Sequence, residues 1–177
     1  MLNKKGNESP QTVSLSNPLI KGVFNYLFLY IMFTFEIINP PKSFIIKKDI
    51  ISEILKKISE IEKDNFFWIL NIVFVSNTEI QELNHNYRKI DKITDVLSFH
   101  YFDNFSKLEE SEIAWEIVLS EEKIIEQGRQ YKLWSELEFY KLFIHSSLHI
   151  LWYDHESDDD YKIMKEKEDI IWDLIFN

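Results

Sequence analysis

The spacing of hydrophobic residues changes several times along the chain between a helical and a strand-like period. In residues 48–62, isoleucine and leucine side chains recur at helical spacing, which predicts an amphipathic helix. Runs rich in β-branched and aromatic residues predict strands over 33–38, 66–75, 95–101 and 113–119. Further helices are predicted over 78–87, 121–127, 135–151 and from about 158 to 175.

Strands come early and helices dominate late, an order that is typical of an α+β domain. We therefore expect a small mixed β-sheet packed with helices. Asn77 or Thr78 is expected to cap the N-terminus of the helix over 78–87. Ser157 or Asp158 is expected to cap the N-terminus of the last helix. With 177 residues, 45% of them hydrophobic, the chain is long enough for one domain with its own core.

Residues 1–31 are predicted to be an extension in front of a single domain over residues 32–177. The first part of this extension is polar and typical of disorder, whereas the second part is apolar, interrupted by Lys21 and Asn25. That apolar part is at the lower edge of membrane-spanning length, so a signal anchor is one alternative. Another is that translation begins at Met32, which we favour because a strand-like alternation follows directly.

Three histidines near the C-terminus have a spacing that indicates a metal site. His145 and His149 are four residues apart, so on a helix their imidazoles lie on one face. On a continuous helix His155 would stand roughly 15 Å from His145, so the helix must end after His149 and the chain must turn back. Three neutral nitrogen ligands leave one position open, as in a catalytic zinc site. The alternative is a helix with two core or surface histidines and an unrelated third.

Composition narrows the chemistry of this site and of its partners. The chain has no cysteine, so zinc would be held by His, Asp or Glu, and the composition suits a reducing cytoplasm. The net charge of −10 argues against a broad nucleic-acid-binding surface, because such surfaces are rich in lysine and arginine. Arg88, Lys89 and Lys92 form a small basic cluster. Any contact with RNA must therefore be local, and the acidic C-terminal helix is expected to be a solvated face.

A second polar segment, residues 83–99, lies between two structured stretches and is typical of a functional loop that enters a strand. The alternative is a turn in which Asp91 and Asp95 bond to their own backbone and Arg88 pairs with a carboxylate. Asp95 and Ser98 are candidates for shaping a cleft, although a structural role is favoured for both.

Together, these two segments resemble the YbeY family, which comprises bacterial endoribonucleases and ribosomal-RNA maturation factors. The family signature His-Gly-x-Leu-His-Leu-x-Gly-Tyr-Asp-His is similar to the run from His145 to His155. The family's Asn-x-x-Tyr-Arg and Asp-x-x-Thr-Asp-Val-Leu-Ser-Phe run is similar to residues 84–99. The similarity extends from about Phe33 to the C-terminus, with the motifs in the family's order.

The resemblance implies a small α+β fold with one zinc ion on a central helix, reminiscent of metalloprotease sites. It implies that His145, His149 and His155 hold the zinc, and that Arg88 is essential and faces the RNA phosphate. The implied activity is endonucleolytic cleavage of single-stranded RNA in 3′-end maturation of 16S ribosomal RNA and in ribosome quality control. The implied partners are this RNA and the small ribosomal subunit in the cytoplasm, not DNA, and not a membrane unless the N-terminal anchor is real.

The chain departs from the family pattern at several positions near the motifs. Ser146 replaces a glycine inside a helix, where it is tolerated, and His100 replaces a proline. Trp115 and Trp152 each replace a glycine. At Trp152 the glycine would permit positive φ where the helix breaks. We therefore expect either a turn with negative φ or a displaced third ligand.

Several alternatives stay open for the chemistry. Metalloproteases place a glutamate after the first histidine, and Ser146 stands there instead, so a peptidase of that type is not expected. Asp154 either orients a ligand histidine or caps a helix. The metal need not be zinc, because iron and nickel also bind imidazole. The rival functions are a non-catalytic ribosome-assembly factor with a structural metal, and a hydrolase of a small phosphorylated or amide substrate.

Overall fold

The computed structural model of the chain describes residues 33–62, 68–101 and 113–177. The N-terminal extension, with the alternatives of a signal anchor and a start at Met32, lies outside the described residues and stays a prediction. So do the first two residues of the strand predicted over 66–75. None of the helices in the described part is long and apolar enough to span a membrane.

The described elements are four strands and five helices, as an α+β domain requires. In chain order they are β1 (Phe33–Ile38), α2 (Lys48–Glu62), β2 (Trp68–Val75), α3 (Asn77–Arg88), β3 (Val96–His100), β4 (Ile113–Ser120), α4 (Glu121–Tyr131), α5 (Ser135–Ile150) and α6 (Asp158–Phe176). Every predicted helix and strand has a counterpart in this order. The predicted fold class is therefore confirmed.

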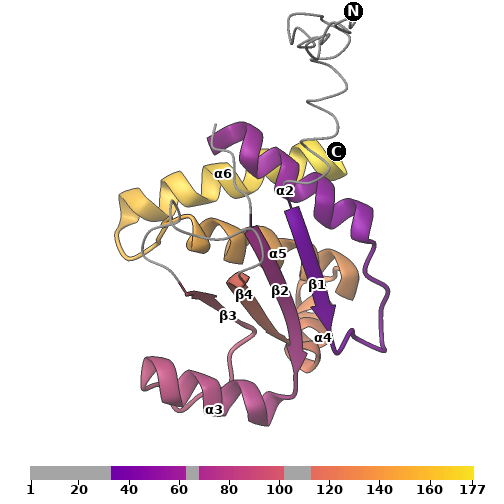
Figure 1. Cartoon of the computed structure of the whole chain (residues 1–177), viewed down its shortest axis with the longest axis vertical. Coiled ribbons are helices and arrows are strands. Elements are labelled where there is room, and N and C mark those ends of the chain that lie inside the picture. Colours follow the sequence, from indigo (N-terminus) through magenta and orange to yellow (C-terminus); the bar gives the residue numbers. More distant parts are fainter. Residues whose placement is uncertain (1–32, 63–67, 102–112) are drawn as a thin grey trace, which may run out of the picture. The chain divides into compact units, whose positions relative to one another are not determined.

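The four strands form one mixed sheet in the order β1-β2-β4-β3 (Figure 1). β1 pairs with β2 and β2 with β4 in parallel, whereas β3 runs antiparallel to β4. β3 is consequently an edge strand with one neighbour in the sheet. Its side chains alternate between the two faces, so Val96 packs in the larger core and Leu97 in the smaller one.

The larger core lies between the sheet and helices α2, α5 and α6, and the smaller core lies under α3. Figure 1 shows α2 and α6 side by side, and α3 apart from them, against β3 and β4. α5 contacts the sheet, α4 and α6, and most of its side chains are buried. α5, which carries His145 and His149, is thus the central helix that the resemblance implied.

Two predicted details of the helix ends are wrong and one is confirmed. The N-cap of α3 is Ser76, not Asn77 or Thr78. Its hydroxyl accepts a bond from the Glu79 backbone N–H while the Glu79 carboxylate accepts from the Ser76 N–H, which satisfies two free donors at once. α4 runs to Tyr131 rather than residue 127. Ser157 caps α6, as predicted.

α5 contains a buried carboxylate, Glu138, whose burial is expected to make the stability of the protein depend on pH. Glu138 is only 3% exposed, and its Oε2 makes no hydrogen bond to any described residue, with Lys141 Nζ 3.6 Å away. Burial raises the pKa of Glu138, Lys141 opposes this shift, and the charge of Asp95 adds to it. The folded protein therefore binds the proton more tightly than the unfolded chain. The contribution of this proton to the free energy of unfolding should be fully present below the pKa that Glu138 has in the unfolded chain. It should be lost as the pH rises through the raised pKa of the folded protein.

We expect Glu138→Gln to stabilise the protein at pH 7 by about 1 kcal/mol, because the amide avoids burying a charge. The difference from wild type should shrink as the pH falls toward 4.5, the ordinary carboxyl value. Urea unfolding at both pH values measures this, with the exposed Glu82→Gln as control. A destabilised Glu138→Gln at pH 7 would mean that the carboxylate is well solvated or well paired.

Candidate metal centre

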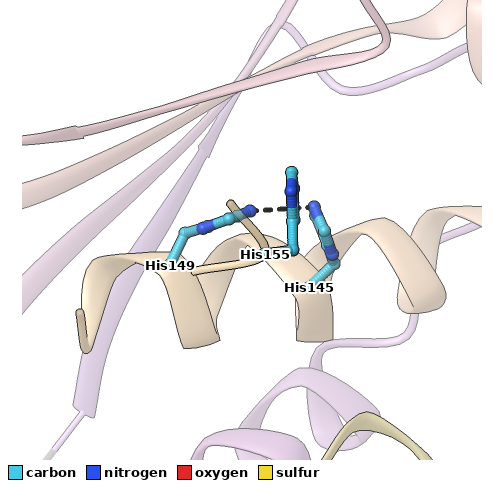
Figure 2. A group of neighbouring side chains, drawn as sticks. All are labelled: His145, His149 and His155. Carbon is cyan, nitrogen blue, oxygen red and sulfur yellow. Dashed lines mark hydrogen bonds between the residues drawn. The ribbon is translucent and has the colours of Figure 1, made fainter. Parts of the chain in front are cut away.

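The side chains of His145, His149 and His155 converge at the C-terminal end of α5 (Figure 2). One ring nitrogen from each residue lies within 4.8 Å of the others. The Nε2 atoms of His145 and His149 are 3.1 Å apart. Two ligands bound tetrahedrally to one zinc ion at 2.0–2.1 Å are roughly 3.4 Å apart, so the group is compact enough for a single ion.

α5 ends in a turn that returns the chain toward its own last residues. The Trp152 N–H donates to the His149 carbonyl at 3.0 Å, and the Tyr153 N–H donates to the Leu148 carbonyl at 3.1 Å. This pair of bonds is a Schellman motif. In this motif the first residue after the helix cap, here Trp152, has a left-handed backbone conformation. The motif reverses the chain within a few residues and delivers His155 to the other two rings.

Both expectations for Trp152 are wrong. Its φ is +68°, in the left-handed region, and yet the third histidine lies beside the first two. A non-glycine residue in this region costs on the order of 1–3 kcal/mol. The two hydrogen bonds of the turn and the packing of α5 hold the backbone there in spite of that cost.

Two acceptors fix the orientation of the imidazoles. Glu168 in α6 lies with its Oε1 2.7 Å from Nδ1 of His145, and the Tyr153 carbonyl oxygen lies 2.9 Å from Nδ1 of His149. Because neither acceptor carries a proton to give, each Nδ1 must donate. In the neutral rings, both Nε2 atoms then carry lone pairs, and these face each other.

Facing lone pairs at 3.1 Å repel unless a cation lies between them, so the arrangement fits a metal ion. Protonation of one ring would relieve the repulsion in another way. Burial lowers the pKa of His149, and the neighbouring His145 lowers it further. For His149, neutral imidazole, the form that binds metals, is therefore favoured at neutral pH.

The group is open to solvent on one side, because His155 is exposed whereas His145 and His149 are half-buried. A substrate can approach from the His155 side. Asp154 makes no hydrogen bond to a ligand ring in the described structure: its Oδ1 accepts a 2.7 Å bond from the His155 backbone N–H. It does not cap the following helix either, because the N-cap of α6 is Ser157.

Arg88 is the last residue of α3 and is exposed. Within the described residues its guanidinium has no hydrogen-bond or ion-pair partner, so the alternative of a carboxylate pair is not seen. Asp95 has a structural environment: it accepts bonds from Gln127 Nε2 at 2.9 Å and from the Val96 N–H at 2.9 Å. Ser98 is half-buried in β3, opposite Ile117.

Sequence reasoning missed Glu168, since all carboxylates near the C-terminus were expected to be solvated. A signal for it was present. Glu168 lies four residues after Met164 and three before Ile171, the two buried residues of α6. It therefore shares their face, which packs against α5.

We expect Glu168→Gln to weaken metal affinity by about 10- to 100-fold, because the charged acceptor that orients His145 is lost. Competition with a chromophoric chelator measures this affinity. Glu166→Gln, on the exposed face of the same helix, is the matched control. Equal affinity in both variants would show that Glu168 does not support the site.

Similar proteins and a family model indicate which family the chain belongs to. The solution structure of TM1509 from Thermotoga maritima is 27% identical and covers 80% of this chain and 91% of that one, with a TM-score of 0.49. Endoribonuclease YbeY of Thermoanaerobacter sp. (strain X514) is 40% identical over 134 residues, which are 69% of this chain and 83% of that protein. Endoribonuclease YbeY of Clostridioides difficile (strain 630) is 39% identical over 136 residues, and the match covers 71% of this chain and 88% of that protein.

The family model described as Endoribonuclease YbeY matches residues 40–175. The resemblance is thus confirmed, and the chain belongs to the YbeY family of endoribonucleases, which are hydrolases that act on RNA.

Proposed function

We propose that this chain is a zinc-dependent endoribonuclease that cuts single-stranded RNA. Its proposed task is 3′-end maturation of 16S ribosomal RNA in the small ribosomal subunit, together with ribosome quality control in the cytoplasm. The observation that carries the proposal is the convergence of three histidine nitrogens at the C-terminal end of the central helix, where His155 is exposed to solvent. The names of the related proteins supply the substrate class.

In this proposal His145, His149 and His155 hold the ion in their neutral forms. A zinc ion held by these residues would supply a Lewis acid near neutral pH. Glu168 and the Tyr153 carbonyl keep the two helical imidazoles in the tautomer that presents Nε2. Ser146, which follows the first histidine, is buried and carries no carboxylate, so it cannot act as the general base that a glutamate provides in metalloproteases.

Arg88 is proposed to bind the phosphate at the bond that is cut. Its guanidinium is exposed and has no partner among the described residues, so it is free to accept a phosphate. The planar fork of arginine matches two phosphate oxygens and stabilises the charge that grows on them. Lys89 and Lys92, both exposed near Arg88 in sequence, add local positive charge to an otherwise acidic chain.

The test is cleavage of a labelled single-stranded RNA by purified protein, with zinc or with a chelator. We expect cleavage with zinc, none with chelator, and recovery when zinc is added back. A duplex RNA and a DNA strand of the same sequence should stay intact. Equal cleavage with and without chelator, surviving in His149→Ala, would contradict the proposal and indicate a contaminating nuclease.

One observation favours a second candidate, a hydrolase of a small substrate. A cavity of about 380 Å³ lies beside the site and is lined by His145 among others; its charged lining residues are Lys141, Lys165 and the four carboxylates Asp95, Glu138, Glu168 and Asp169. This excess of carboxylates suits an amide compound better than a phosphorylated one. Screening such compounds in the same assay separates the two functions, because an RNA nuclease leaves them unchanged.

A further inference from the structure

Three of the positions at which this chain departs from the family pattern lie together. Trp115 and His100 are directly opposite each other where β4 pairs with β3, so their side chains lie on the same face of the sheet. The ring centroids of His100 and Trp152 are 4.5 Å apart, with 58° between the ring planes. The three rings lead from the core, where Trp115 is 4% exposed, to the surface, where Trp152 is 61% exposed.

Trp152 combines backbone strain with exposure, and packing alone does not explain this combination. Its left-handed φ of 68° is one that glycine would adopt without strain at the end of a helix. Because most of the indole is in water, its burial repays little of that strain. Strained residues gather at sites that bind or react with ligands. Trp152 therefore has the features of a residue that contacts a ligand with its exposed ring.

We propose that Trp152, held by His100, is a stacking platform for one unpaired base of the RNA substrate. The inference rests on the proposed function and adds a binding site to it. Trp152 lies three residues after His149 and three before His155, so the backbone keeps its Cα within about 11 Å of each. A base on this ring belongs to a nucleotide close to the bond that is cut.

The charge of the chain favours a base as the ligand. With a net charge of −10, the protein gains little from the release of counterions by the RNA backbone. Stacking on an aromatic ring needs no charge and is open to every base, but only when the base is unpaired. Trp152 would therefore contribute both affinity and the preference for single strands.

The first experiment measures steady-state cleavage of a short single-stranded RNA by the full chain loaded with zinc. Trp152→Leu keeps the bulk and the backbone strain but removes the aromatic ring. We expect KM to rise about tenfold, with kcat within about threefold of wild type. Trp152→Phe, which keeps a ring, should recover most of the loss.

The matched control is Trp134→Leu. Trp134 is 75% exposed and precedes α5, so it lies roughly 24 Å from the end that carries His149. Its side chain makes no capping bond to the helix. We expect this variant to cleave RNA with the KM of wild type.

The second experiment locates the base. Binding is measured with chelator present, to stop cleavage, on copies of the RNA that each lack one base. Wild type should bind about tenfold more weakly when the missing base is at one or two neighbouring positions. Trp152→Leu should bind these RNAs as it binds the intact RNA, because removing the base and removing the ring break the same contact. Trp152→Gly should show the same loss of affinity as Trp152→Leu without a lower melting temperature, since glycine removes the strain.

An unchanged KM in Trp152→Leu, with the wild-type response to missing bases, would overturn the platform and leave the proposed function standing. The platform would also be overturned if Trp152→Leu bound a protein partner more weakly but bound RNA as wild type does, because the ring would then contact that partner. Wild-type protein that neither binds nor cuts RNA would overturn the proposed function, and the platform with it.

Discussion

Replacing His149 by alanine is expected to lower RNA cleavage by on the order of 10³-fold and to remove the metal from the protein. Metal catalysis contributes several kcal/mol, and each 1.36 kcal/mol is a factor of ten in rate. His149 is the middle ligand in sequence, and its Nε2 faces that of His145 at 3.1 Å. Without it two nitrogens remain, whereas a catalytic zinc site has three protein ligands.

The measurement combines a single-turnover cleavage assay with elemental analysis of the same preparation. His85→Ala is the matched control, because His85 is exposed in α3 and belongs to no cluster of metal-binding side chains in the described structure. We expect this control to keep both metal and activity. His149→Ala protein that retains one metal ion per chain and cuts RNA at the wild-type rate would refute the assignment of the ligands.

Arg88→Glu is expected to lower kcat/KM by about 10²- to 10³-fold while leaving the metal content unchanged. The substitution removes the charge that stabilises the phosphate and places a like charge in front of it. Arg88→Lys should fall between this variant and wild type, because lysine keeps the charge but loses the planar fork. Since Arg88 is exposed and has no partner among the described residues, neither variant should unfold the protein.

Arg129→Glu is the control for this pair, because Arg129 is an exposed arginine in the last turn of another helix, α4. Growth complementation adds a second measurement that bears on the rival function. An assembly factor with a structural metal requires that Arg88→Glu supports ribosome maturation and that chelation unfolds the protein. The nuclease requires the reverse: a folded but inactive chain after chelation, and no complementation by Arg88→Glu.

Local patterns predicted the elements well, because each depends on residues that are close in sequence. The alternation in residues 33–38 and the stripe in residues 48–62 correspond to β1 and α2. The spacing of His145 and His149 required one helical face, and the position of His155 required a chain reversal, which the structure contains.

One detail that sequence reasoning missed depends on a contact between distant segments, and another on the hydrogen bonds of a local turn. The bond from His145 to Glu168 joins residues 23 positions apart, and nothing in the local sequence distinguishes Glu168 from the solvated carboxylates around it except its place on the buried face of α6. The prediction for Trp152 is wrong because a non-glycine residue intrinsically disfavours positive φ. The Schellman hydrogen bonds at the end of α5 outweigh this preference.

The metal content of full-length protein purified without added ions tests the central claim most directly. We predict about one zinc per chain in wild type, bound through His145, His149 and His155, and almost none in His149→Ala. Folded wild-type protein that holds no metal, takes up none from solution and still cuts RNA would contradict the account.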